Sequence, residues 1–138
     1  MEKRRDLFKL AGIGAFAAFA GPAQAAGKLP SGTTKADQAK LLKEHFGDVR
    51  VYYEGPTDQL RSMTAGSAVV NTGMEHEPHQ HEEEEFMVIT EGAADISVEG
   101  KVTKVGPGSM MYCAAGKLHG IKNTGSKPVL FYYYKWKA

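Results

Sequence analysis

The chain has 138 residues, with 17 basic and 16 acidic side chains, five histidines and one cysteine. This length suits one domain, and a net charge of +1 without a dense basic stretch excludes nucleic acid as a partner. A single cysteine excludes a disulfide framework and a metal site built from several thiolates. The 16 glycines and the negative mean hydropathy favour strands and turns over a helical bundle.

Residues 1–25 have the layout of an export signal. A basic start is followed by an apolar stretch over residues 10–20, and residues 23–25 read Ala-Gln-Ala, the small-x-small pattern that signal peptidase accepts. The pair Arg4 and Arg5 resembles a twin-arginine signal, with an ordinary secretory signal as the alternative. Eleven apolar residues fall short of the roughly 20 that span a bilayer, so we expect no stable membrane anchor. The predicted location is periplasmic or secreted.

Residues 26–47 are expected to form a linker and one short helix. The helix would run from Thr34 to Phe46 and end at Gly47, with Leu41 and Leu42 on its packed face. Beyond it no helical period recurs. Short runs rich in β-branched and aromatic residues, separated by Gly, Pro, Asn or Asp, predict seven or eight strands, the clearest at 49–53, 60–64, 68–70, 86–90, 94–98, 109–113 and 129–136. Residues 48–138 should therefore form an all-β barrel or sandwich.

Four of the five histidines lie between His76 and His119. In a strand, His79 and His81 would leave the same face because side chains alternate, and continued alternation places Glu85 on that face. Two imidazoles and a carboxylate on one side form half of a divalent-metal site. His119 is the natural candidate for a third imidazole, because the small residues at 114–116 predict a tight turn before it.

Two sequence motifs resemble those of the cupin superfamily. The first motif is Gly, five residues, His-x-His, three or four residues, Glu, six residues, Gly. It is matched at Gly73, His79, His81, Glu85 and Gly92. The second is Gly, five residues, Pro-x-Gly, two residues, His, three residues, Asn, and it is matched at Gly108, Gly116, His119 and Asn123. Ala114 stands in the proline position, which is the one departure. Together the motifs cover about half of the chain, from residue 68 to residue 134.

The resemblance implies a small jelly-roll barrel that holds one divalent metal through His79, His81, Glu85 and His119. Fe, Mn, Ni and Zn all tolerate three imidazoles and one carboxylate, so the ligands alone do not select the metal. Such a set leaves one or two coordination positions for water or substrate, as a catalytic site requires.

Other residues are candidates to line the pocket. Met87 and Ile89 share the parity of Glu85, and either Met111 or Tyr112 should face inward. His76 has the opposite parity to His79, which predicts a position in a loop or at the rim, with a chance of reaching substrate. Near the C-terminus, alternation sends Phe131 and Tyr133 to one face and Tyr132, Tyr134 and Trp136 to the other. One set should fill the barrel or its back, while the other is a candidate homodimer surface or edge cover.

Three further expectations concern side chains near the site. Cys113 ends an apolar run and is expected to be a small buried hydrophobe rather than a nucleophile. His45, on the expected helix, is a bystander. No basic residue is obviously placed inside the barrel, and Arg61 and Lys122 are the nearest candidates to grip a substrate carboxylate.

Two classes of function remain open. In the first, the protein is an enzyme on a small molecule, either a dioxygenase using Fe(II) or an isomerase, lyase or decarboxylase in which Mn, Ni or Zn polarises a carbonyl. In the second, it is a non-catalytic module that binds a small ligand, a sugar or the metal itself. The complete ligand set favours the enzyme, but fold membership does not decide the reaction, and no catalytic residue is assigned.

Overall fold

The computed structural model describes residues 27–138, which contain ten β-strands and no helix. The predicted signal at residues 1–25 lies outside the described residues. The strands are β1 (Lys40–Glu44), β2 (Gly47–Gly55), β3 (Ser62–Val70), β4 (Glu75–His79), β5 (Glu84–Glu91), β6 (Ala94–Val98), β7 (Lys101–Val105), β8 (Met110–Cys113), β9 (His119–Asn123) and β10 (Val129–Lys137). Residues 27–138 contain no helix that is long and apolar enough to cross a bilayer.

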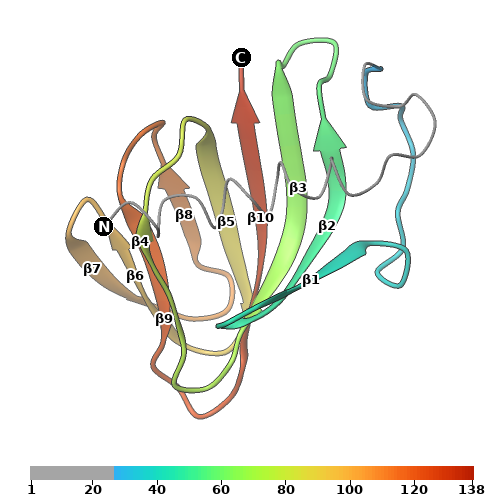
Figure 1. Ribbon diagram of the computed structural model, residues 1–138. Helices are drawn as coiled ribbons and strands as arrows, with labels where there is room; N and C mark the ends of the chain where they lie inside the picture. The colour runs from blue at the N-terminus through green and yellow to red at the C-terminus, as the bar shows by residue number, and fades with distance from the viewer. Residues whose placement is uncertain (1–26) are drawn as a thin grey trace.

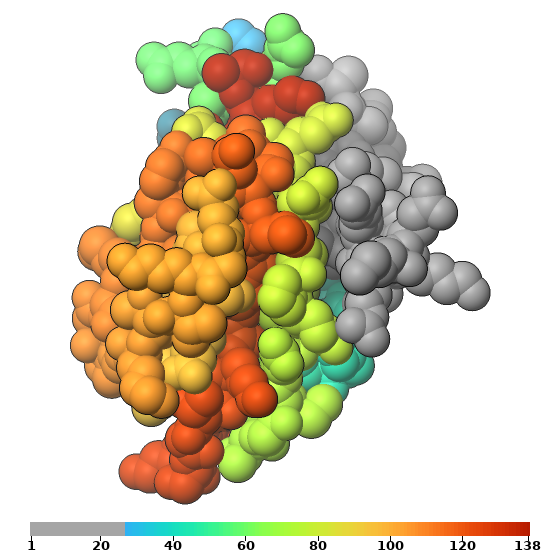
Figure 2. Space-filling model, turned by 90° about the vertical axis from the view of Figure 1, so that its left-hand side faces the viewer, coloured from blue at the N-terminus to red at the C-terminus, as the bar shows by residue number. Residues whose placement is uncertain are grey.

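The strands form two antiparallel sheets that enclose a common interior (Figure 1). The large sheet has the order β1-β2-β3-β10-β5-β8, and the small sheet has the order β4-β9-β6-β7. Figure 2 shows the small sheet from outside, with the β6–β7 hairpin in light orange beside the strands that carry the second motif. The all-β jelly-roll prediction is therefore confirmed.

The short helix predicted over residues 34–46 is wrong. Residues 40–44 are β1, which pairs with β2 through a tight hairpin, and Lys43 Nζ reaches Asp48 Oδ1 across it at 2.8 Å. A short isolated helix gains little by itself, whereas an edge strand gains a ladder of backbone hydrogen bonds from β2. Gly47 is no helix end: a Cβ there would collide with the carbonyl of Val69, so this glycine permits a close approach of two backbones.

The strand predictions need smaller corrections. Residues 60–64 and 68–70, expected as two runs, belong largely to the single strand β3. The charged or glycine-containing segments β4 and β9 were not among the runs named as strands, because neither is rich in β-branched or aromatic residues, although the alternation of His79 and His81 presupposed a strand there. Both are nonetheless essential to the site, since they form the small-sheet wall that carries two of its histidines.

Inward-facing side chains of the large sheet are stacked in three cross-strand rows. Directly paired residues on antiparallel strands share a face, so the register defines each row. The deepest row is Val49, Ala68, Phe131 and Ile89; the next is Gly66, Tyr133, Met87 and Met111; the uppermost is Glu54, Thr64, Lys135, Glu85 and Cys113. The first two rows are buried and mostly apolar, whereas the uppermost carries the charges. The interior is thus a hydrophobic floor beneath a polar layer.

Candidate metal centre

Four buried side chains meet between the two sheets at the level of the polar row. They are His79 at the end of β4, His81 in the connection that follows, Glu85 on β5 and His119 at the start of β9. One ligand atom from each lies within 4.8 Å of all the others. His79 and His119 are direct cross-strand partners in the small sheet, and Glu85 faces them from the large sheet. The structure therefore brings together all four residues that the motifs singled out.

Backbone carbonyls orient the three imidazoles. The Nδ1 atoms of His79, His81 and His119 lie 2.8, 3.0 and 3.0 Å from the carbonyl oxygens of Glu77, Glu83 and Lys117, respectively. A carbonyl oxygen only accepts hydrogen bonds, so each Nδ1 carries the hydrogen. The lone pair of each neutral ring is then on Nε2, which is the arrangement that outer hydrogen bonds give to metal-binding histidines.

The donor set fits a divalent cation. Glu85 Oε2 lies 2.8 Å from His81 Nε2 and 2.9 Å from His119 Nε2. When Nδ1 of a neutral imidazole carries the hydrogen, its Nε2 is an acceptor, and the carboxylate oxygen of Glu85 is an acceptor too. Two acceptors approach one another this closely only when a proton or a metal ion lies between them. Three nitrogens and one oxygen suit Fe, Mn, Ni or Zn. The residues present thus fit the metal that the motifs implied.

The protonation behaviour of the cluster reflects burial and mutual contact. Burial is the largest influence on Glu85 and would raise its pKa. In the metal-free protein a proton can take the place of the metal between Glu85 Oε2 and the Nε2 atoms of His119 and His81, and the resulting hydrogen bonds outweigh burial and hold the pKa far below the usual value. Burial, together with the nearby His119, lowers the pKa of His79 to about 4. Burial acts in the same direction on His81, yet contacts with Glu83 and Glu85 prevail and raise its pKa.

His76 is not at the rim, contrary to the prediction. It is buried on β4, with its ring centroid 4.2 Å from that of His79 and 4.5 Å from that of Phe46. The β4–β9 register shifts between His76 and His79, around Pro78. Such an irregularity breaks the two-residue alternation, so residues three apart in sequence face the same side. His76 therefore packs beneath the site, behind His79.

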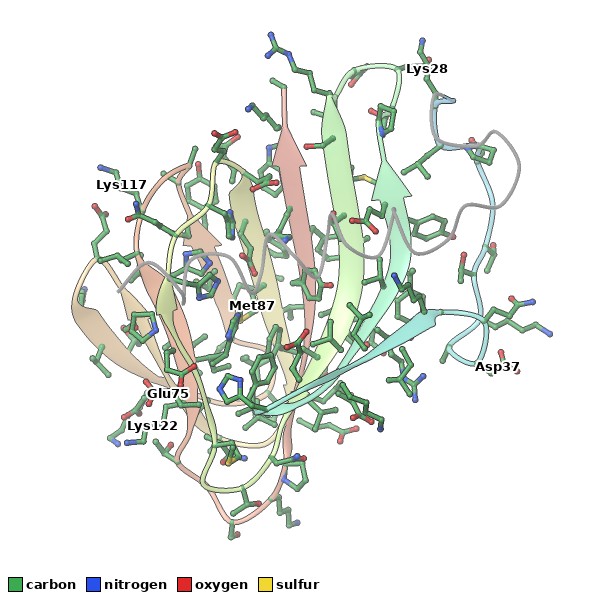
Figure 3. All side chains as sticks on the ribbon, viewed as in Figure 1. Lys28, Asp37, Glu75, Met87, Lys117 and Lys122 are labelled. Carbon is green, nitrogen blue, oxygen red and sulfur yellow. The ribbon has the colours of Figure 1, made fainter. Side chains whose placement is uncertain are left out.

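The residues predicted to line the pocket divide into buried and exposed ones. Met87, Ile89 and Met111 are buried, and Figure 3 shows Met87 between the two sheets. Tyr112 takes the outer parity and is 55% exposed, with its hydroxyl donating to Glu84 Oε1 on the outer surface. Met111 is thus the inward member of the Met111/Tyr112 pair, and Tyr112 does not line the interior.

The aromatic segment of β10 alternates as predicted. Phe131 and Tyr133 are buried in the core, whereas Tyr132, Tyr134 and Trp136 lie on the outer parity. Trp136 Nε1 donates to Glu84 Oε2 there. The homodimer suggested for such a surface stays a prediction.

Lys135 is the residue that the sequence prediction missed. Its side chain points inward from β10 and the residue is only 6% exposed. The proposed alternatives, Arg61 and Lys122, are exposed, and Figure 3 shows Lys122 extending away from the small sheet. The available signal was the alternation itself, since Phe131, Tyr133 and Lys135 share one parity.

The remaining motif residues shape the turns around the site. All four motif glycines have positive φ, namely Gly73, Gly92, Gly108 and Gly116. Gly92 shows why a side chain is excluded, because a Cβ would lie 2.7 Å from the carbonyl oxygen of Pro128. Asn123 is buried, and its Nδ2 donates to the carbonyls of Val70 at 2.9 Å and Lys127 at 2.8 Å.

Cys113 is buried as predicted, and its thiol contacts the carbonyls of Ala114 and Lys117. Burial raises the pKa of this thiol, which is the opposite of what activates a nucleophile. His45 is largely exposed and its Nε2 lies 3.1 Å from Glu77 Oε2, so it stands outside the cluster.

A curated relative and several solved structures are similar to this chain. A 5-nitrosalicylic acid 1,2-dioxygenase from Bradyrhizobium sp. is 33% identical over 70 residues, which are 51% of this chain and 34% of the relative. The chain thus spans about a third of that relative's length. An RmlC-like cupin from Shewanella frigidimarina matches with a TM-score of 0.64 and 13% identity, covering 79% of this chain and 93% of that one.

A third similarity is to the polyketide cyclase RemF from Streptomyces resistomycificus, with a TM-score of 0.64 and 19% identity, covering 79% of this chain and 81% of that one. At these identities the two structural matches support the fold alone. The family of cupin domains called Cupin_2 matches residues 66–134, a stretch that contains both motifs and all four clustered side chains. The chain therefore belongs to the Cupin_2 family.

Proposed function

We propose that this protein is a metal-dependent enzyme that acts on a small organic molecule, with a dioxygenase reaction as the leading candidate. The observation that carries the proposal is the buried cluster of His79, His81, Glu85 and His119, whose ligand atoms lie within 4.8 Å of one another. On a five- or six-coordinate metal, four protein ligands leave one or two positions open for substrate, whereas four ligands complete a tetrahedral structural zinc site. All four residues are buried.

The similarity to a 5-nitrosalicylic acid 1,2-dioxygenase supports the reaction type. That relative is about three times as long as the matching stretch, so the activity of the whole relative comes to this chain only as a proposal. Its name indicates an aromatic substrate with a carboxylate and a hydroxyl group, the two kinds of oxygen donor that bind a metal side by side.

Each part of the interior has a role in the proposed reaction. Three imidazoles and Glu85 would hold the metal, which would supply Lewis acidity and, if it is iron, electrons for reaction with O₂. The carbonyls of Glu77, Glu83 and Lys117 keep the imidazoles in the orientation needed for binding. Met87 and Met111 form an apolar floor that excludes water from the reacting molecule.

Oxygen consumption by the reconstituted protein tests the proposal. The full chain is stripped with a chelator, loaded anaerobically with Fe(II), Mn(II), Ni(II) or Zn(II), and mixed with 5-nitrosalicylate or salicylate in an oxygen electrode. We expect oxygen uptake that matches substrate loss with Fe(II), none in His119→Ala, and normal uptake in the matched control His45→Ala. Turnover without oxygen would favour an isomerase or lyase instead. Ligand-dependent thermal shifts without turnover by any metal would favour a binding module.

We further propose that residues 1–25 direct export by the twin-arginine route. Support comes from Arg4 and Arg5 ahead of a short apolar stretch that ends in a small-x-small pattern. A twin-arginine substrate crosses the membrane already folded, so it could take up its metal in the cytoplasm and thereby fix a choice that the ligands leave open. Replacing both arginines with lysine should block export. Unchanged export with the same metal would contradict this proposal.

A further inference from the structure

Lys135 is a buried cation one strand away from the metal ligands. It pairs directly with Glu85 on β5 and with Thr64 on β3, and its side chain shares their inward face. Adjacent strands lie about 4.8 Å apart, so the stem of Lys135 starts immediately beside Glu85. The flexible four-carbon stem lets the ammonium group reach the polar layer above Tyr133 and Met87.

Burying an ammonium group is unfavourable unless carboxylates compensate it. Three carboxylates act on Lys135, with Glu85 first, then Glu83 and Glu54. Glu54 belongs to the same polar row, beyond Thr64, and is only half-buried. A methionine would fill the same space without the desolvation cost, as Met87 and Met111 do in the row below. The fold therefore does not require a cation at this position.

The negative charge that compensates the Lys135 ammonium group decreases when the cluster holds a metal. Glu85 Oε2 is directed toward the Nε2 atoms of His81 and His119. Glu85 then shares its negative charge with the divalent cation, and less of it remains to compensate Lys135. The metal-loaded interior would thus present two neighbouring positive centres, with Glu83 and Glu54 as the remaining carboxylates that act on Lys135. An anionic ligand that bridges both centres is favoured.

We propose that Lys135 is the anion-binding residue of the site: it holds the carboxylate of a small organic acid while a second oxygen of that acid reaches the metal. This inference rests on the proposed function, because it places the ligand at the same metal, and it narrows the substrate class to small carboxylates. Thr64, next to Lys135 on β3, adds a hydroxyl along the same row. The apolar floor formed by Met87 and Met111 suits the hydrocarbon part of such an acid.

Paired ligands and paired variants test this role. The affinities of salicylate and of salicylamide, its uncharged counterpart, are measured by calorimetry on the full chain loaded with Zn(II), which excludes oxidative turnover. Lys135→Met should weaken salicylate binding by about 10- to 100-fold, as expected for a lost charge-assisted hydrogen bond, and leave salicylamide nearly unchanged. Lys135→Arg should restore most of the affinity for salicylate. The control Lys122→Met removes an exposed lysine and should alter neither affinity.

Metal content is measured on every variant. This measurement distinguishes a failure of the role proposed for Lys135 from a failure of the proposed metal-dependent function. Wild-type affinity for salicylate in Lys135→Met would overturn the inference, and so would a loss of affinity that merely follows loss of zinc. If Lys135→Met does not fold, the comparison uses Lys135→Arg and the wild type. The inference is overturned if each of these two proteins binds salicylate and salicylamide with equal affinity. Absence of bound metal in the wild type would instead overturn the proposed function.

Discussion

Lys135 on β10 and Glu85 on β5 are direct cross-strand partners, and both side chains are buried inside the barrel. Glu85 links two structural units, since it faces the His79–His119 pair of the small sheet and shares the polar row of the large sheet. The metal ligands and the buried lysine are therefore parts of one polar layer. A substitution of either residue should therefore alter the electrostatic environment of the other, because the charge of Glu85 compensates Lys135 and its carboxylate completes the metal-ligand set.

Removing one imidazole should release the metal. His119 is 2% exposed and its Nε2 lies 2.9 Å from Glu85 Oε2, at the centre of the cluster. In His119→Ala we expect the bound metal to fall from about one per chain to below about 0.1 after dialysis, because three donors hold a divalent cation much less tightly than four. Elemental analysis of the purified protein provides the measurement.

His45→Ala is the matched control for that experiment, since His45 is largely exposed and outside the cluster. It should retain the metal at the wild-type level. Full metal content in His119→Ala with a native circular dichroism spectrum would show that this histidine is not a ligand.

Part of the site could be predicted from the sequence because the decisive information is local. The spacing of His79, His81 and Glu85 falls within seven residues, and the alternation of Phe131 and Tyr133 follows from strand geometry. The small-residue turn at 114–116 made His119 a candidate and the family resemblance supported it, although it lies 34 residues from Glu85. Its contact with Glu85 depends on the pairing of β4 with β9, which no local pattern in the sequence indicates.

The sequence predictions were wrong where tertiary contacts, rather than the local residue pattern, determined the structure. The polar and apolar residues of β1 were compatible with a helix, and pairing with β2 decided the matter. The irregularity near Pro78 reversed the parity expected for His76. Lys135 was overlooked because a lysine between aromatic residues suggests exposure, although its parity with Tyr133 places it inside.

Gly66 should not tolerate even a methyl group. It lies on β3 beside Tyr133, and a Cβ would collide with the carbonyl oxygen of Arg50 and the hydroxyl of Tyr133. Gly66→Ala should therefore lower the free energy of unfolding by about 1–3 kcal/mol, because neither a paired strand nor a buried ring can retreat freely. Urea denaturation measures the change. Gly106→Ala is the control, since its Cβ would meet no atom within 4 Å and the loss should stay within about 0.5 kcal/mol. Equal losses in the two variants would refute this steric account.

The stability of the fold should depend on the side-chain amide of Asn123, and another polar group should not replace it. Its Nδ2 donates to the carbonyls of Val70 and Lys127, and its Oδ1 accepts from the backbone of Gly125. In Asn123→Asp the two carbonyls would face a carboxylate that has no hydrogen to donate. We expect a loss of about 3 kcal/mol in unfolding free energy at neutral pH. Asn71→Asp makes the same change at an exposed position and should cost little. A comparable loss at both positions in thermal unfolding would rule out the proposed role of the buried amide.

The metal-free protein should lose stability as the pH falls from about 6.5 to about 5. Burial keeps His76 and His79 neutral: it lowers the pKa of His79 from 6.5 to about 4 and that of His76 well below 6.5. In this window the unfolded chain binds protons that the folded chain does not, so the free energy of unfolding decreases by up to about 1.4 kcal/mol per pH unit for each group. The raised pKa of His81 opposes this loss only near the upper end of the window, where the unfolded imidazole is still taking up its proton. Its stabilising contribution is complete at lower pH and disappears as the pH rises.

His76→Phe isolates one of the two contributions, since the new ring can pack against Phe46 as the imidazole does. Urea denaturation of chelator-treated protein at several pH values in this window should give about half the wild-type slope of unfolding free energy against pH. His45→Gln, at an exposed position, should leave the slope unchanged. Glu83 contributes little in this range, because the hydrogen bond with His81 lowers its pKa to about 2. Burial raises the pKa values of Glu44 and Glu54, which opposes the loss of stability, but both glutamates are present in the two proteins compared. An unchanged slope in His76→Phe would mean that His76 takes up its proton in the folded protein, and that its burial beneath the metal ligands does not keep it neutral.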